Sequence, residues 1–168
     1  MKKLLLFFFL LAASFAGIAD IIAPSGNVNK QAGYTPVFMS RETLEKSVMY
    51  ISGSHELIRT GKIYYRDPYI FVNERYKGVH VINNTDPSHP VNEGFILAPG
   101  CIDMAVKDNI LYLDNAVDLV SFDLDARQVT QRNRNVFPEP LPPDDLMVFW
   151  HYKRPNDYIL VDWKKTYR

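Results

Sequence analysis

The sequence predicts an all-β fold of about two propeller-like blades, each built from short antiparallel strands. One observation is a two-strand pattern that occurs twice, in residues 69–83 and 110–123. A second is its spacing: Ile110 follows Tyr69 at an offset of 41 in the numbering, and Asp118 follows Gly78 at an offset of 40. A period of about 40 residues made of short strands is typical of propeller blades. The alternative is an ordinary meander, whose half-buried strands look alike without being repeats.

The N-terminus predicts a secretory signal peptide over residues 1–19 and a linker over residues 20–33. Lys2 and Lys3 precede an uncharged stretch, 4–19, which is shorter than the roughly 20 residues of a membrane-spanning helix. An uncleaved membrane anchor and a buried helix are the alternatives. Residues 34–168 are then the repeat domain.

The first element of this domain is predicted to be a short amphipathic helix. Ser40 is a suitable N-cap, and Leu44, Val48 and Ile51 follow at helical spacing. The sequence therefore predicts about three turns, ended by Gly53, with the apolar stripe against the sheet.

Short apolar runs bounded by turn residues predict the strands that follow. Asp67-Pro68 and Asp108-Asn109 supply turn chemistry, and Gly78 suits a tight hairpin. After Leu124 the strand pattern loosens: residues 127–135 are polar, and the proline-rich stretch 137–145 is predicted to be an extended loop. The predicted strands are 62–65, 69–73, 79–83, 95–97, 102–106, 110–114, 119–124, 147–152 and 158–163.

An ordered series of motifs over residues 34–163 resembles the LVIVD-repeat family, exported bacterial proteins with a β-propeller-like fold that are often lipoproteins. Those motifs are Tyr34-x-Pro-Val-x-Met-Ser40, Gly61-Lys-Ile-Tyr64, Tyr69-Ile-Phe-Val-Asn73, Asp86-Pro-x-x-Pro90, Pro99-Gly-x-x-Asp103 and Asp118-Leu-Val-Ser-Phe-Asp123. The chain departs from the family in having no lipobox cysteine and only about two repeats. The resemblance therefore implies a short or truncated member, one that assembles with copies of itself, or a small open-sheet relative. It brings no activity and no site residues.

Composition and residue spacing exclude several kinds of partner and cofactor. The 19 basic and 19 acidic residues balance, so no field attracts nucleic acid. Cys101 is the single cysteine and is expected to be a buried thiol rather than a nucleophile. The histidines lack zinc-ligand spacing and no phosphate-binding glycine loop is present, so no metal or cofactor is predicted. The many aspartates at strand ends are expected to serve turns rather than to bind calcium.

The most suggestive polar cluster is Asn73, Glu74, Arg75 and His80, all within one predicted hairpin. A carboxylate, a guanidinium and an imidazole there form a candidate ligand groove. The alternative is a salt-bridged hairpin surface.

Together these observations predict an exported protein of the periplasm, cell envelope or extracellular space that acts as a non-catalytic binding module. The expected partner is a protein or a carbohydrate, or a second copy through open sheet edges, with membrane contact only through an uncleaved signal. The alternatives are an envelope enzyme with a loop-built site at Glu74, Arg75 and His80, and a non-functional fragment of a longer propeller.

Overall fold

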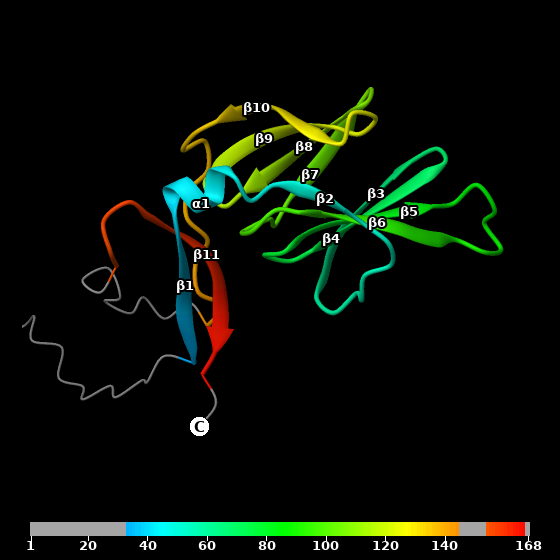
Figure 1. The fold of residues 1–168 in the computed structure, drawn as a ribbon. Coiled ribbons are helices and arrows are strands. Elements are labelled where there is room, and N and C mark those ends of the chain that lie inside the picture. Colours follow the sequence, from blue (N-terminus) through cyan, green and yellow to red (C-terminus); the bar gives the residue numbers. More distant parts are fainter. Residues whose placement is uncertain (1–32, 145–153, 167–168) are drawn as a thin grey trace, which may run out of the picture. The chain divides into compact units, whose positions relative to one another are not determined.

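A computed structural model describes residues 33–144 and 154–166, and these residues form strands with one short helix (Figure 1). The elements are β1 (Tyr34–Ser40), α1 (Arg41–Glu45), β2 (Met49–Ser52), β3 (Thr60–Arg66), β4 (Tyr69–Glu74), β5 (Gly78–Asn83), β6 (Val91–Leu97), β7 (Met104–Lys107), β8 (Ile110–Asn115), β9 (Asp118–Asp123), β10 (Gln128–Asn133) and β11 (Tyr158–Lys165).

The strands form three antiparallel sheets, which confirms the all-β class. One sheet has five strands in the order β2-β6-β5-β4-β3, and a second has four in the order β10-β9-β8-β7. The third pairs β1 with β11, near the two ends of the described chain (Figure 1). Within the two larger sheets, β3 to β6 and β7 to β10 are meanders in which each strand pairs with the next one along the chain.

The two predicted hairpins form with matching registers. Tyr69 pairs with Asn83 in β4–β5, and Ile110 pairs with Asp123 in β8–β9. The link of the first hairpin contains Tyr76 at φ 65°, and the shorter link of the second contains Ala116 at φ 58°. The link of the second hairpin is one position shorter, which accounts for the change of offset from 41 to 40.

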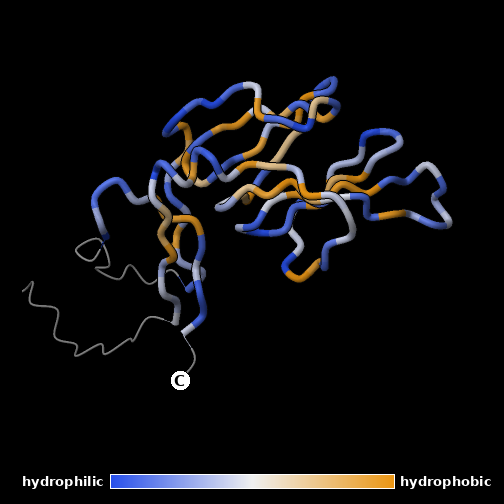
Figure 2. Tube along the Cα trace, in the orientation of Figure 1, coloured by the Kyte–Doolittle hydropathy of each residue, from blue (hydrophilic) through white to orange (hydrophobic). Residues whose placement is uncertain are grey.

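The main core lies between the two larger sheets, where each contributes its inward-facing apolar residues. Strand β3 contacts β7 and β2 contacts β10, so the sheets meet along both margins. Hydrophobic residues run along the inner strands of both sheets in Figure 2. The buried cluster is Phe71, Val79, Val81, Ile96, Ala98, Cys101, Met104, Val106, Leu111, Leu113, Val120 and Phe122.

Two smaller clusters attach β1, α1 and β11 to the larger sheets. Leu44 packs with Val117 and Ile159, and Trp163 packs with Leu160 and Tyr76. Because Tyr76 belongs to the β4–β5 link and Val117 to the β8–β9 link, β11 is anchored near both hairpins.

The helix prediction is wrong in extent. Ser40 does cap α1, accepting a hydrogen bond from the Thr43 N–H, but the helix ends at Glu45. Val48 precedes strand β2 and Ile51 lies within it, pairing with Phe95 of β6. Val48 and Ile51 are β-branched and favour a strand, and pairing with β6 stabilises that strand. Three apolar residues at helical spacing are too weak a signal to predict a longer helix.

Strands β1, β2 and β10 form where the sequence predicted none, and β10 lies in the polar stretch 127–135. The predicted signal peptide, nearly all of the linker, and the predicted strand 147–152 lie outside the described residues. Among the described residues, no helix is long and apolar enough to cross a membrane.

Candidate functional site

Three of the four residues predicted to form a ligand groove are buried at the β4–β5 hairpin. Asn73 and Glu74 end β4 and His80 lies in β5, with exposed fractions of 0%, 5% and 1%. The His80 Nε2 atom lies 3.5 Å from the Glu74 Oε2 atom. Arg75 is exposed in the link, and its guanidinium lies 5.8 Å from the centre of the Tyr76 ring. The structure therefore brings Glu74 and His80 together and leaves Arg75 apart.

The Glu74 carboxylate holds the connection between β2 and β3. Its two oxygens accept hydrogen bonds from the backbone N–H groups of Ile58 and Arg59, at 2.9 and 2.5 Å. A carboxylate with both oxygens engaged by backbone groups has a structural role already.

His80 is buried, with its ring 4.8 Å from that of Phe95. Burial lowers the pKa of His80, and the neighbouring Glu74 carboxylate offsets this only in part. The imidazole is therefore neutral at pH 7. Its Nδ1 atom lies 3.3 Å from the Asn92 amide, which also donates to the His55 carbonyl.

Asn73 fixes the hairpin to the chain that follows β6. Its amide donates to the carbonyls of Gly78 and Cys101 and contacts the Cys101 thiol at 3.2 Å. Burial, with the nearby Asp114 carboxylate, raises the pKa of Cys101 well above its ordinary value. The thiol stays protonated and buried, as the sequence predicted.

Aspartates at strand ends bond to the backbone. Asp114 accepts from the N–H groups of Ile102 and Asp103, and Asp123 accepts from those of Asp125 and Ala126. The described residues contain no group of three or more histidine, cysteine, aspartate or glutamate side chains placed to hold a metal.

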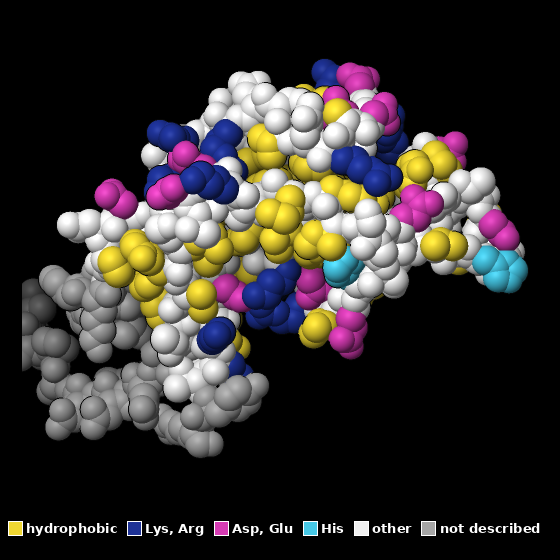
Figure 3. Space-filling view, viewed as in Figure 1, with side chains coloured by type: hydrophobic (Ala, Val, Ile, Leu, Met, Phe, Trp, Pro, Cys, Tyr) yellow, Lys and Arg dark blue, Asp and Glu magenta, His cyan; other side chains and the backbone are white. Residues whose placement is uncertain are grey.

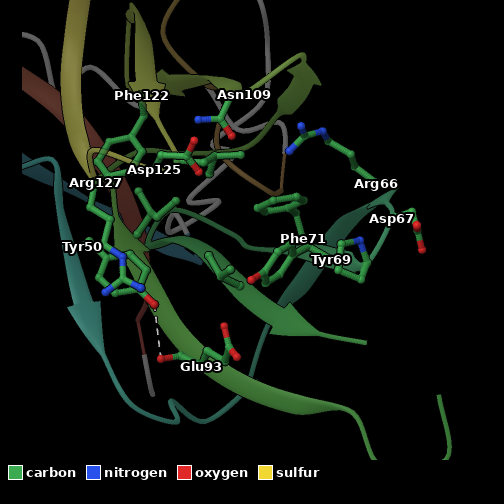
Figure 4. A pocket seen from close by; sticks show the side chains of 14 residues that line it. Tyr50, Arg66, Asp67, Tyr69, Phe71, Glu93, Asn109, Phe122, Asp125 and Arg127 are labelled. Atoms are coloured by element: carbon green, nitrogen blue, oxygen red, sulfur yellow. Dashed lines mark hydrogen bonds between the residues drawn. The ribbon is translucent and has the colours of Figure 1, made fainter. Parts of the chain in front are cut away.

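A cavity of about 490 Å³ opens between the two larger sheets, at one end of their strands. We call it the inter-sheet pocket (Figure 4). Its floor is made of Phe71, Val81, Ile96, Phe122 and Leu124. Its rim, which is polar and aromatic except for one proline, is made of Tyr50, Arg66, Asp67, Pro68, Tyr69, Glu93, Asn109, Asp125 and Arg127.

Three turns bring rim residues to this end of the sheets. Residues 66–69 form the β3–β4 turn, Asn109 belongs to the β7–β8 turn, and residues 124–127 connect β9 to β10. Alternate turns of an antiparallel meander lie at the same end of its sheet. Because the two meanders pack against each other, the turns of both surround one cavity.

Tyr50 is held in place at the rim by contacts with Arg127 and Glu93. The Arg127 guanidinium lies 4.2 Å from the centre of its ring, in cation–π geometry, and its hydroxyl donates to the Glu93 carbonyl at 3.3 Å. Gly94 leaves room for the ring, because a Cβ atom there would overlap the Tyr50 phenol. A side chain larger than hydrogen at position 94 would displace Tyr50.

Charges of both signs surround the inter-sheet pocket. Arg66 lies across the cavity from Arg127, with Asp125 on the Arg127 side (Figure 4). One oxygen of Glu93 accepts from the Asn83 amide at 2.7 Å. Arg66 and Asp125 form no ion pair with any residue in the described ranges. Their charges are therefore available to a ligand.

Sequence reasoning missed the inter-sheet pocket, since its residues belong to separate turns. One signal was present: Arg66-Asp-Pro-Tyr69 and Lys107-Asp-Asn-Ile110 occupy equivalent places in the two copies, at an offset of 41. Equivalent turns of two packed meanders lie near each other, but the sequence does not indicate which faces of the sheets meet.

Comparison with protein-family models, curated proteins and solved structures finds no match to this chain. The resemblance to the LVIVD-repeat family thus stays a prediction from the motifs alone.

Proposed function

We propose that this chain is an exported, propeller-like β-repeat protein that acts as a non-catalytic binding module. The inter-sheet pocket is its binding site. The observation that carries the proposal is a cavity with an apolar floor and a mixed-charge rim, built by both larger sheets. Small-molecule sites combine these features, at volumes of about 300–1,000 Å³.

Three further observations support the rest of the proposal. The two four-stranded meanders have matching hairpin registers, which suits two blades of a propeller-like array. The ordered motifs of residues 34–163 resemble the LVIVD-repeat family. The charged and apolar segments of residues 1–19 support export.

The enzyme alternative at Glu74, Arg75 and His80 has less support. Both Glu74 oxygens are bonded to the backbone, and Arg75 lies apart from the buried pair. A hydrolase activity abolished by His80→Ala in a folded protein would restore this alternative.

Self-association is a second proposed interaction. Strand β3 is an edge of its sheet, and its Ile63 and Tyr65 side chains are 68% and 59% exposed. Exposed apolar edges favour strand pairing with a second copy. Sedimentation across a concentration series tests this proposal. The Ile63→Lys variant should be more monomeric than wild type at the same concentration. A wild-type chain that is monomeric at every concentration would exclude self-association.

The binding function is tested by titrating isotope-labelled protein with a library of small polar compounds and recording amide chemical shifts. We expect compounds that perturb residues 50, 66–69, 93, 109 and 124–127 together. Arg66→Ala should weaken the binding of these compounds. Lys107→Ala is the matched control, since Lys107 is exposed at the equivalent place in β7 and does not line the pocket. A library that perturbs only other surfaces would refute the proposed site.

A further inference from the structure

We propose that the inter-sheet pocket binds a neutral saccharide. This inference rests on the proposed binding function and adds the chemical class of the ligand.

The rim charges argue against a strongly charged ligand. Two arginines and the carboxylates of Asp67, Glu93 and Asp125 line the same cavity. An anion would be attracted by Arg66 but repelled by the carboxylates, and a cation would be repelled by the guanidinium groups. A neutral ligand that both donates and accepts hydrogen bonds can use the rim without either penalty.

The free groups of the rim match hydroxyls in their bonding capacity. The Arg66 guanidinium donates only and the Asp125 carboxylate accepts only. Glu93 gives one oxygen to the Asn83 amide, and its Oε2 atom accepts no hydrogen bond from a described residue. Each hydroxyl of a sugar is both donor and acceptor, so a sugar carries a matching hydrogen-bond partner for each of these three side chains.

The placement of these groups favours a ligand that is polar around its perimeter. Arg66 lies across the cavity from Asp125, and Glu93 lies apart from both, so the cationic and anionic groups are spread around the rim (Figure 4). A zwitterionic amino acid needs its cationic and anionic partners close together at one end. A sugar ring carries hydroxyls around its edge, as this arrangement requires.

Aromatic side chains supply the apolar contact. Tyr50 and Tyr69 are half-buried at the rim, and the Tyr69 and Phe71 rings lie 6.4 Å apart with a tilt of 40°. Tyrosine presents an apolar ring with a polar tip, which suits a ligand that has C–H faces and hydroxyl edges.

The test is calorimetric titration of the full chain with cellotriose, maltotriose and N-acetylchitotriose. Trigalacturonate, L-phenylalanine and inorganic phosphate serve as anionic, zwitterionic and inorganic comparators. We expect saturable binding of at least one neutral trisaccharide. Glu93→Gln and Asp125→Asn should each weaken it at least tenfold. Glu56→Gln, at an exposed position outside the pocket, should leave it unchanged.

The outcomes separate this inference from the binding function. If a comparator binds at the pocket and no neutral trisaccharide does, the saccharide class is wrong and the binding function stands. If no probe of any class perturbs the amides of the rim, the inference is wrong and the pocket loses its support as a binding site. Trisaccharide binding that survives both carboxylate substitutions would also overturn it. Amide spectra of each variant verify that it is folded.

Discussion

The Asp118 side chain pairs with two arginines. It is fully buried and accepts hydrogen bonds from the guanidinium groups of Arg41 and Arg132 and from the Asn135 N–H. Burial opposes ionisation of Asp118, but these donors outweigh it and lower the pKa of the carboxyl. One side chain thus ties α1 to both strands of the β9–β10 hairpin.

Replacing Asp118 by Asn should lower the free energy of unfolding at pH 7 by about 3 kcal/mol, because two largely buried arginines lose their counter-ion. Since the folded-state pKa lies below the ordinary value of 3.8, the carboxylate stabilises the fold above about pH 4. The deficit of D118N relative to wild type should therefore shrink as the pH falls below about 4. Urea unfolding at several pH values measures it. Asp108→Asn, at an exposed turn, should cost under about 0.5 kcal/mol. A D118N deficit that is constant down to pH 3 would contradict the assignment.

His80 predicts a second pH dependence at higher pH. Its folded-state pKa lies below the ordinary value of 6.5 because of burial. The neutral ring stabilises the fold above about pH 6.5, and this stability is lost as the pH falls toward the folded-state pKa. Thermal melting between pH 7.5 and pH 5 should fall less steeply for His80→Gln than for wild type. Equal slopes in His80→Gln and wild type would show that His80 does not govern this pH dependence.

At the element scale, local sequence predicted the hairpins and missed β1, β2 and β10. Strands β1 and β2 pair with distant partners, and β10 pairs with the adjacent β9 but is a polar segment without an apolar run. The strands around Gly78 and around Asp118 alternate or run apolar between turn residues, so short-range patterns suffice. Strand β1 pairs with β11, whose Trp163 lies opposite Pro36, and no local signal reports a partner so far along the chain. Local sequence also could not predict the inter-sheet pocket, because its rim forms only when the two sheets pack against each other.

Gly78 opens β5 and has a steric requirement that can be tested. Its φ is 148°, and a Cβ atom there would overlap the Ile96 carbonyl oxygen of the neighbouring strand. The Ile96 backbone cannot move away without loss of the β5–β6 pairing. Gly78→Ala should therefore destabilise the fold by more than about 2 kcal/mol. Gly53→Ala is the matched control: its φ is 97° but its Cβ would meet no atom within 4 Å. It should cost only the backbone strain, about 1 kcal/mol. Chemical denaturation that ranks the two variants equally would refute the steric argument.

At the scale of the whole molecule, the three sheets are joined by contacts that cross between them. Asp162 of β11 bonds to Lys77, in the β4–β5 link, and to Arg59, before β3. Arg41 of α1 bonds to Asp118 of β9. The charges on the face seen in Figure 3 are of both signs and lie side by side, so these links act as local pairs rather than as one field. Cross-sheet pairs and shared apolar clusters together predict that the sheets unfold as one unit.

Leu160→Ala tests this cooperativity. Leu160 is fully buried in β11 and packs with Tyr76 and Trp163, so truncation should cost about 2–5 kcal/mol. If the sheets unfold together, the far-ultraviolet and near-ultraviolet dichroism transitions should both move to lower urea and still coincide. Hydrogen exchange should accelerate in β8 and β9 as well as in β11, because the opening reaction is then global. Leu141→Ala, at a side chain that is 65% exposed, should shift neither transition measurably. Faster exchange confined to β1 and β11 would show instead that this pair opens alone and that the two meanders hold their fold, and the inter-sheet pocket, without it.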